Sequence, residues 1–461
     1  MKYIGKYKIR GLLGRGGMGK IYKVEHPLIG KIFALKLLDP DPLIVSLMGW
    51  NKIAEMFKTE AMTIAGLRHP NIVEILDYDE SDDKPYYLME YYVNNLGAMI
   101  GETYRIEQAS RKLTIEKAIR YTSQTLNALD RMHHAGIIHR DIKPYNLLLT
   151  DHDAIKVCDF GLSRLRGEKF EGPPSLKVGS AWYAPPEQED NPDKVNCSAD
   201  LYAVGITIYR MLAGVLPVDD YAPVSRFNAD LDQTWDDFIR KAIAPRPAQR
   251  YLCAAEMLAD LKRLQAAWEA KKAQICRLPE LDNTRNSGPA NTSLTLRSSP
   301  IKINPRNAKE KFDLDDLWRP ARFVQNAFEI NPDGTITDQA TGLVWQQSGA
   351  EFPLTWPQAN DYVQELNSSQ FAGSNSWRLP TINELMTLLT ELPHGEDYCI
   401  ESVFDLRQKW IWSCDRRSFT AAWYVSIDMG YVAWQDFTGY YHVRAVRHLK
   451  PLNSNGPAFS D

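Results

Sequence analysis

The sequence predicts a multidomain α+β protein in which two folded parts are separated by a polar segment. At 461 residues the chain is too long for one typical domain. Residues 277–310 are rich in Asn, Ser, Thr and Pro and hold few apolar side chains, so they bury too little surface to offset the entropy of ordering. Beyond residue 310 the composition becomes aromatic, with eight of the twelve tryptophans. We therefore expect domains over 1–276 and 311–461, joined by a flexible linker over 277–310.

The overall composition narrows the class of protein. A hydrophobic content of 44% and a net charge of −4 are ordinary for a soluble protein, and without a strongly basic stretch we expect no nucleic-acid partner. No apolar run is long enough to span a bilayer, and none resembles a signal peptide. The six cysteines are scattered without a Cys-x-x-Cys pair, which argues against a zinc site and suits a reducing compartment. We therefore expect no membrane span and a cytoplasmic location.

The most informative stretch is His139-Arg140-Asp141-Ile142-Lys143-Pro144-Tyr145-Asn146, followed closely by Asp159-Phe160-Gly161. Phosphoryl transfer from ATP needs a carboxylate that orients a hydroxyl and accepts its proton. It also needs oxygen ligands that hold a divalent cation across the phosphates. Asp141 fits the first role, and Asn146 and Asp159 fit the second.

Three further features precede this stretch in the chain: a glycine-rich run, a lysine at the end of an apolar run, and a glutamate in a helical stretch. The run from Leu13 to Ile21 contains Gly14, Gly16 and Gly19, and missing side chains let its backbone N–H groups approach phosphate oxygens. Taken by itself, this run is more often an ordinary glycine turn between strands than a phosphate-binding loop. Lys36 ends the apolar run Phe33-Ala34-Leu35-Lys36, and Glu60 lies in a following helical stretch.

Together these phrases resemble the bacterial branch of eukaryotic-like Ser/Thr protein kinases, over roughly residues 5–266. The resemblance implies a bilobal kinase fold, ATP and Mg²⁺ (or Mn²⁺) as cofactors, and protein substrates. It implies catalytic roles for Asp141, Lys143, Lys36 and its partner Glu60, and Lys143 marks the Ser/Thr class. It also implies an adenine site in which Met89 is the gatekeeper, Glu90 and Tyr92 offer backbone groups, and apolar side chains sandwich the ring. The implied ATP-binding set is Leu13, Gly14, Gly16, Gly19, Ile21, Ala34, Lys36, Met89, Glu90, Tyr92 and Leu148.

The same resemblance identifies residues 179–187 as the end of the activation segment. Arg140, beside Asp141, is expected to await a phosphate on that segment, which can order a loop by pairing with an arginine. Ser175 is the favoured acceptor, and Ser180 is expected to support the substrate-binding floor. Constitutive activity without phosphorylation stays open. Asp200 and Arg250, the latter as the partner of Glu187, are expected to brace the site.

The C-terminal part shows two helix starts and several short strands. Thr355-x-x-Gln358 and Thr381-x-x-Glu384 are capping boxes, in which the Thr oxygen and the N3 side chain satisfy the first backbone N–H groups. Strand-like runs are expected over 334–346, 410–413, 422–426, 430–434 and 441–447. Short strands around two helices predict an α+β domain.

Five phrases of this part resemble C-type-lectin-like domains, of the branch shared by formylglycine-generating-enzyme-like domains and the variable proteins of diversity-generating retroelements. They are residues 341–346, 377–381, 412–413, 422–425 and 443–447. The resemblance implies a recognition module for an unknown ligand or protein. An alternative function is a retroelement variable protein whose main role is ligand binding. The expected recognition surface comprises Phe419, Tyr431, Trp434, Phe437, Tyr440 and Tyr441.

Overall fold

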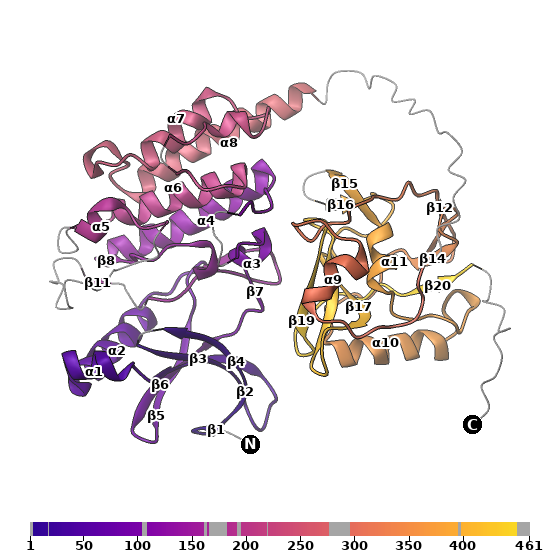
Figure 1. Ribbon diagram of the computed structural model, residues 1–461, viewed down its shortest axis with the longest axis horizontal. Helices are drawn as coiled ribbons and strands as arrows, with labels where there is room; N and C mark the ends of the chain where they lie inside the picture. Colours follow the sequence, from indigo (N-terminus) through magenta and orange to yellow (C-terminus); the bar gives the residue numbers. More distant parts are fainter. Residues whose placement is uncertain are drawn as a thin grey trace. The chain divides into compact units, whose positions relative to one another are not determined.

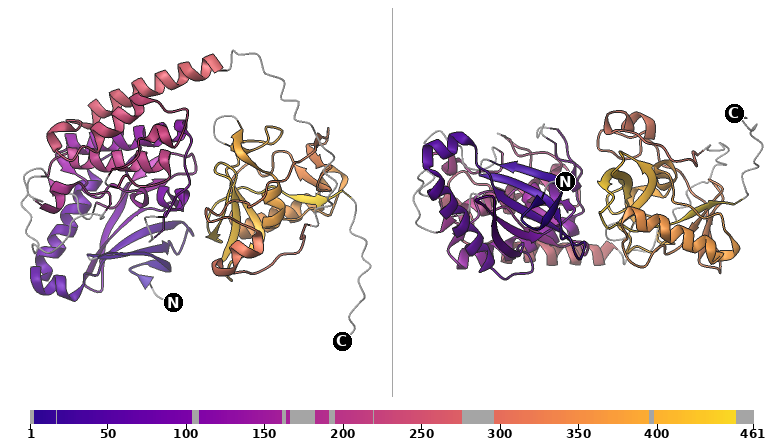
Figure 2. Two further views of the ribbon diagram at one scale, coloured as in Figure 1. Left: turned by 45° about the horizontal axis from the view of Figure 1, so that its top comes forward. Right: turned by 90° about the horizontal axis from the view of Figure 1, so that it is seen from below.

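The computed structural model describes residues 3–16, 18–103, 108–160, 164–165, 182–190, 195–218, 220–275, 296–394 and 398–449. The chain divides into two compact units, Met1–Pro279 and Glu280–Asp461 (Figures 1 and 2). Among the helices within these ranges, none is both long enough and apolar enough to cross a membrane.

The first unit opens with a six-stranded antiparallel sheet in the order β1-β2-β3-β4-β6-β5 (Figure 1). Val24, Leu35 and Leu88 are buried on one side of it with Tyr7 and Tyr86, which gives this lobe its own core. Helices α1 and α2 intervene between β4 and β5, and α2 carries Glu60. The elements are β1 Tyr3–Ile4, β2 Tyr7–Gly16, β3 Gly19–Glu25, β4 Ile32–Leu38, α1 Pro42–Met48, α2 Trp50–Ala65, β5 Ile75–Ser81 and β6 Lys84–Glu90.

The rest of the first unit is mainly helical. Helix α6 is buried on nearly every side because its sequence is apolar around the whole circumference, so it forms the centre of this lobe. The catalytic-loop residues lie between strands β8 and β9, which pair with β11 and β10. The helices are α3 Leu96–Ile100, α4 Ile115–His134, α5 Pro186–Asp190, α6 Ser198–Ala213, α7 Gln233–Ala242 and α8 Ala254–Ile275. The strands and the 3₁₀ turns are β7 Asn94–Asn95, β8 Ile137–Ile138, η1 Pro144–Asn146, β9 Leu147–Leu149, β10 Ile155–Val157, β11 Arg164–Leu165, η3 Val224–Arg226 and η4 Pro247–Gln249.

The second unit is the expected α+β domain. A four-stranded antiparallel sheet, β12-β13-β14-β20, joins early strands to the last one, and a three-stranded sheet, β17-β18-β19, packs on a shared core with Trp345 and Trp423 at its centre. Both capping boxes are confirmed, at Thr355 of α10 and Thr381 of α11. The elements are α9 Pro305–Phe312, β12 Phe328–Ile330, β13 Thr335–Asp338, β14 Leu343–Gln346, α10 Trp356–Ser368, η5 Phe371–Gly373, α11 Ile382–Thr387, β15 Leu389–His394, β16 Tyr398–Ile400, β17 Trp410–Arg416, β18 Ala421–Ser426, β19 Tyr431–Asp436 and β20 Val446–His448.

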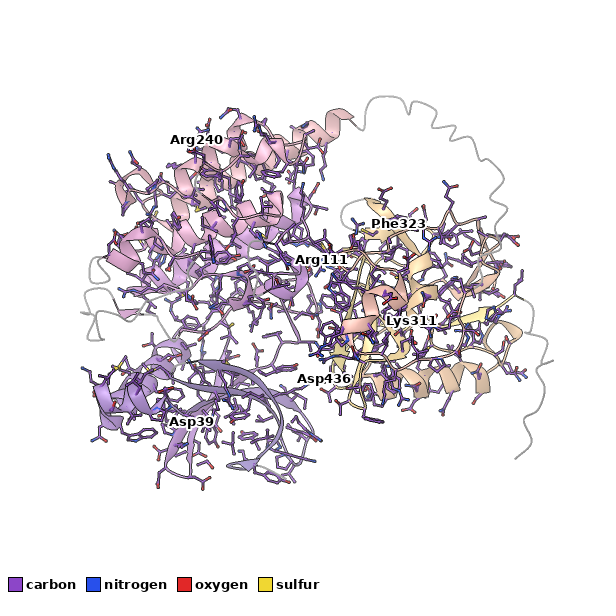
Figure 3. The ribbon with its side chains drawn as sticks, in the orientation of Figure 1. Asp39, Arg111, Arg240, Lys311, Phe323 and Asp436 are labelled. Atoms are coloured by element: carbon purple, nitrogen blue, oxygen red, sulfur yellow. The ribbon has the colours of Figure 1, made fainter. Side chains whose placement is uncertain are left out.

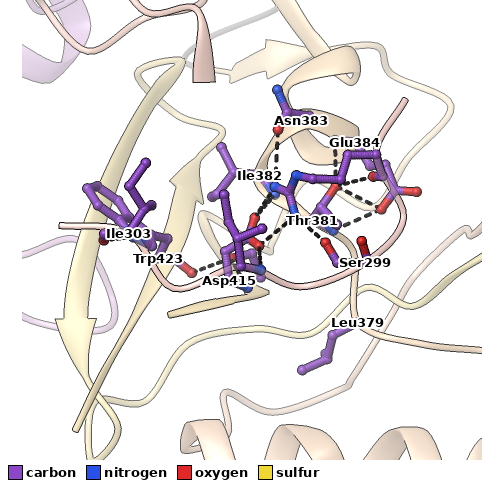
Figure 4. A network of polar contacts seen from close by, with 12 residues as sticks. Ser299, Ile303, Leu379, Thr381, Ile382, Asn383, Glu384, Asp415 and Trp423 are labelled. Carbon is purple, nitrogen blue, oxygen red and sulfur yellow. Dashed lines mark hydrogen bonds and ion pairs between the residues drawn. The ribbon is translucent and has the colours of Figure 1, made fainter. Parts of the chain in front are cut away.

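Residues 296–304, which we call the strap, correct the predicted linker of 277–310. The strap runs beside β17, where Ile303 N–H donates to Arg416 O at 2.9 Å and Arg416 N–H donates to Ile301 O at 2.8 Å. Asp415 binds the guanidinium of Arg297, and Figure 4 shows the polar network around Asp415 from close by. Ile301 and Ile303 pack against the domain core, and α9 follows directly. Polar composition suggested a linker, but two apolar anchors and one ion pair order this end of the segment.

Candidate active site

The catalytic loop brings Asp141, Lys143 and Asn146 together as the sequence predicts. The Lys143 ammonium donates to Asp141 Oδ2 at 2.8 Å. The Asn146 amide donates to Asp141 Oδ2 at 3.0 Å and to the Asp141 carbonyl at 2.8 Å. Asp141 is only 8% exposed, so these donors fix its carboxylate in one orientation. A carboxylate held in this way can accept a proton from a hydroxyl placed beside it.

Asp200 on α6 fixes the start of this loop through hydrogen bonds. Its carboxylate accepts the backbone N–H groups of His139 at 2.9 Å and Arg140 at 2.8 Å, and lies 2.8 Å from the His133 ring. Burial opposes the charge, but the hydrogen bond from His133 and the other neighbours keep the pKa of Asp200 below its usual value. Arg140 has a φ of 66°, a conformation that non-glycine residues seldom adopt. The buried Asp200 carboxylate therefore holds a strained turn immediately before Asp141.

A second cluster forms around Lys36 at the centre of β4. Its ammonium lies 2.7 Å from Glu60 Oε1 and 3.7 Å from Asp159 Oδ1, and the Tyr87 hydroxyl donates to the same Glu60 oxygen at 2.9 Å. Burial alone would lower the pKa of Lys36, but Tyr87, Glu60 and Asp159 together raise it well above its usual value. The structure thus gives the predicted pair Lys36–Glu60, and places the Lys36 ammonium, whose charged form its neighbours favour, 3.7 Å from the Asp159 carboxylate.

Asn146 and Asp159 fit the predicted role of cation ligands. The amide nitrogen of Asn146 already donates to two Asp141 oxygens, so Oδ1 is the atom through which Asn146 would hold a cation. Asp159 has a φ of 63°, and its side chain is 38% exposed. Carboxylate and amide oxygens are the ligands that Mg²⁺ prefers, usually completed by phosphate oxygens and water.

The glycine-rich run forms the β2–β3 hairpin. A Cβ at Gly14 or Gly16 would meet nothing within 4 Å, so the backbone at these two positions faces open space. Gly19 differs, because a Cβ there would lie 2.2 Å from the Leu37 carbonyl oxygen of β4. Gly14 and Gly16 thus leave room for a phosphate, while Gly19 lets two strands pack closely.

The predicted adenine-site residues occupy adjoining strands. Ala34 and Met89 stand directly opposite each other in the β4–β6 register and are 7% and 8% exposed. Leu13 is exposed, and the Tyr92 hydroxyl donates to the Glu90 carboxylate at 2.7 Å. The half-buried members of the set are Ile21, Leu148, Glu90 and Tyr92.

The end of the activation segment is clamped by Arg250. Its guanidinium donates to both Glu187 oxygens, at 2.6 and 2.8 Å, and its side chain is fully buried. Gln188 donates to the Arg140 carbonyl at 2.8 Å, so this end is also tied to the catalytic loop. Ser175 and Ser180 lie outside the described residues.

The predicted recognition surface is wrong for several of its members. Tyr431 and Tyr441 are 4% and 1% exposed, and the Trp434 ring packs on Trp423 with 5.2 Å between centroids. The Phe437 ring stacks on Trp356 at 4.4 Å. Phe419 and Tyr440 alone of the six are largely exposed, at 77% and 50%. The reason is that the β17-β18-β19 sheet is covered on both faces, and every residue of β18 is buried.

Sequence reasoning missed two residues of the active site. Tyr87 shares Glu60 with Lys36, and His133 shares Asp200 with the catalytic loop. Tyr87 faces Lys36 in the β4–β6 register, so pairing those strands would have placed it. His133 stands at the end of α4 and carried no signal that separates it from a surface histidine.

Comparison with known proteins gives two family matches. Residues 7–263 match the protein kinase domain, and residues 334–447 match the Lcl C-terminal domain. The C-type-lectin-like resemblance of the second domain therefore stays a prediction. A crystal structure of the kinase domain of Mycobacterium tuberculosis PknI is 26% identical, with a TM-score of 0.44, and covers 57% of this chain and 97% of that one.

Named relatives match the same part of the chain. A probable serine/threonine-protein kinase of Clostridium perfringens is 31% identical over 275 residues, which is 56% of this chain and 38% of the relative. Serine/threonine-protein kinase PrkC of Bacillus subtilis is 32% identical over 272 residues, 56% of this chain and 40% of the relative. The chain thus spans less than half the length of these relatives. The match to the protein kinase domain covers more than half of this chain, and the motif residues of the chain converge as described. The chain therefore belongs to the protein kinase family.

Proposed function

We propose that this chain transfers the γ-phosphoryl group of ATP to serine and threonine hydroxyls of proteins, itself included. The supporting observation is the convergence of two buried clusters, Lys36–Glu60–Asp159 and Asp141–Lys143–Asn146. The serine/threonine kinases that the chain resembles favour the same substrate class.

The geometry suggests what each group does. Lys36, kept charged by its neighbours, binds and orients ATP phosphate oxygens. Asp141 orients the substrate hydroxyl and accepts its proton as the new P–O bond forms and the bond to ADP breaks. Lys143, beside Asp141, offsets negative charge on the transferred group. A divalent cation, held by Asn146 and Asp159, would neutralise charge on the phosphates.

The test is transfer of labelled phosphate from ATP to the protein itself and to a mixed Ser/Thr peptide library. Asp141→Asn should lower the rate by about 10²–10⁴-fold, the usual effect of losing an acid–base group. Asp130→Asn is a matched control, because Asp130 lies on α4 and its partly exposed carboxylate is 3.6 Å from the exposed His134 ring. Equal rates for wild type and Asp141→Asn would refute the assignment.

We propose further that the second domain recognises a ligand or protein and that activity is controlled through Arg140 and Ser175. Phe419 and Tyr440, the exposed members of the expected surface, support the first part. Phosphopeptide mapping after incubation with Mg²⁺-ATP tests the second part, with Ser175, or hydroxyls of the polar segment such as Ser287, Thr292 and Ser298, as expected sites. Modification confined to residues 311–461 would contradict it.

A further inference from the structure

Glu102 lies outside every predicted motif, yet it contacts both the catalytic loop, through Tyr145, and the end of the activation segment, through Tyr183. It follows α3, whose end is fixed in two ways. Gly101 adopts the left-handed conformation with a φ of 74°, which commonly ends a helix. The Arg111 side chain, labelled in Figure 3, donates to the Met99 and Ala98 carbonyls, each at 2.8 Å. Glu102 is therefore held rigidly, and it is only 7% exposed.

The backbone of Glu102 contacts the catalytic loop. Its carbonyl accepts the hydroxyl of Tyr145, at 2.5 Å, and Tyr145 stands between Lys143 and Asn146 in the chain. The Tyr145 ring lies against Gly97 of α3, where a Cβ would come within 2.9 Å of ring atoms. The catalytic loop and the end of α3 therefore pack as one piece.

The carboxylate of Glu102 contacts the activation segment. Tyr183, which is 2% exposed, donates its hydroxyl to Glu102 Oε2 at 2.9 Å. Its neighbour Trp182 is 44% exposed, so the buried Tyr183 side chain anchors a stretch that reaches the surface. Burial raises the pKa of Glu102, while the Tyr183 bond and the charges of Arg210 and Lys143 act in the opposite direction.

Burying a carboxylate costs free energy, and apolar residues of similar shape often give a protein equal stability. The buried Glu102 carboxylate therefore points to a role other than stability alone. Here the bonds join three elements that must keep a fixed arrangement for transfer to occur. We propose that Glu102 is a positioning residue that ties the Tyr183 end of the activation segment to the catalytic loop, so that a protein substrate presents its hydroxyl to Asp141. This inference rests on the proposed kinase activity.

The first experiment separates positioning from simple structural support by steady-state kinetics on the full chain. The probe is the best single peptide from a Ser/Thr peptide library. Tyr183→Phe and Glu102→Gln should each raise the KM for peptide about tenfold, the effect of one hydrogen bond to a charged group. The KM for ATP should stay within about twofold, and the double variant should be no worse than either single one.

Tyr121→Phe is the matched control. Tyr121 is likewise fully buried in the same lobe, on α4. Its hydroxyl donates to the Asp153 carboxylate and lies 3.7 Å from Met99 Sδ of α3, and Asp153 lies outside the catalytic loop and the activation segment. This substitution should leave the peptide KM unchanged. If Tyr183→Phe and Glu102→Gln also leave it unchanged while wild type is active, the inference is overturned.

Hydrogen exchange supplies a readout that needs no catalysis. Glu102→Gln and Tyr183→Phe should speed amide exchange over residues 182–188, and Tyr121→Phe should not. Unchanged exchange in this stretch would overturn the inference even in a chain that transfers no phosphate. An inactive wild type with faster exchange in both variants would instead refute the proposed function and leave the tie between the two segments established.

Discussion

Arg297 and Asp415 form an ion pair with two hydrogen bonds, at 2.8 and 2.7 Å, that fastens the strap to β17. Asp415 is completely buried and also accepts the backbone N–H groups of Ile301 at 2.9 Å and Ile382 at 2.8 Å. One carboxylate therefore connects the strap, the start of α11 and the three-stranded sheet (Figure 4). Within the described residues, the ordered contacts of the second domain thus extend back to Arg297, well before the 334–447 region that matches the Lcl C-terminal domain.

Removing the arginine should destabilise the second domain strongly. Arg297→Met leaves the Asp415 carboxylate buried without its cation, and such a change typically costs about 3–5 kcal/mol. Calorimetry of the full chain should show a lowered transition for this domain. Arg407→Met is the control, because Arg407 pairs with Asp405 at 2.6 Å but is 82% exposed, and surface pairs contribute about 1 kcal/mol or less. Equal losses in the two variants would contradict this prediction.

Asp200 should make the stability of the kinase unit depend on pH. Its pKa is lowered in the folded protein, so its contribution is present above the unfolded pKa of about 4 and is lost as the pH falls through the lower, folded value. Asp200→Asn should be less stable at pH 7 and should lose less stability than wild type below pH 4. Urea titrations at several pH values measure both effects, and parallel curves for the two proteins would count against the role of Asp200.

Arg250→Lys should weaken the clamp on Glu187 although it keeps the charge. An ammonium cannot reproduce the two parallel bonds of the guanidinium, or its bonds to the carbonyls of Ala244 at 2.6 Å and Pro245 at 2.8 Å. We expect a loss of about 1.5–3 kcal/mol, the range for hydrogen bonds to charged groups. Arg240→Lys, at an exposed pair with Asp237, should change stability by no more than about 0.5 kcal/mol. Denaturant midpoints compare the two.

Aromatic residues of the second domain should divide into two groups on mutation. Phe419→Ser and Tyr440→Ser should change the free energy of unfolding by no more than about 0.5 kcal/mol, because both side chains are largely exposed. Trp434→Ser should destabilise by about 1–3 kcal/mol, because its partly buried ring packs against Trp423 and Trp318. If Trp434→Ser left the domain as stable as wild type, Trp434 would be available for recognition after all.

The sequence alone predicted the contacts of site residues that lie close together in the chain or belong to an ordered set of motifs. Asp141, Lys143 and Asn146 lie within six consecutive residues, so their spacing already implied that they meet, and Lys36 with Glu60 followed from the order of the motifs. Thr381 and Glu384 gave a helix start because both capping partners belong to one turn. These predictions needed no knowledge of which distant segments pack together.

The errors arose where distant segments decide burial. The density of aromatic residues between residues 419 and 441 suggested an exposed surface, but Trp434 packs against Trp423 and Trp318, and the Phe437 ring stacks on Trp356. Arg297 looked like part of a polar linker because its partner, Asp415, lies 118 residues away. Glu102 was missed for the same reason: its two tyrosine partners come from separate segments that the fold brings together.

The bond between Trp423 and the strap has a spectroscopic consequence. The fully buried Trp423 indole donates to the Ile303 carbonyl at 3.1 Å, and its ring stacks on Trp318 with 5.8 Å between centroids. Release of the strap would expose this indole to water and separate it from that hydrogen-bond acceptor. The fluorescence emission maximum of Trp423 should then shift to longer wavelength. A chain in which the other tryptophans are replaced by phenylalanine would report strap release through this shift in real time.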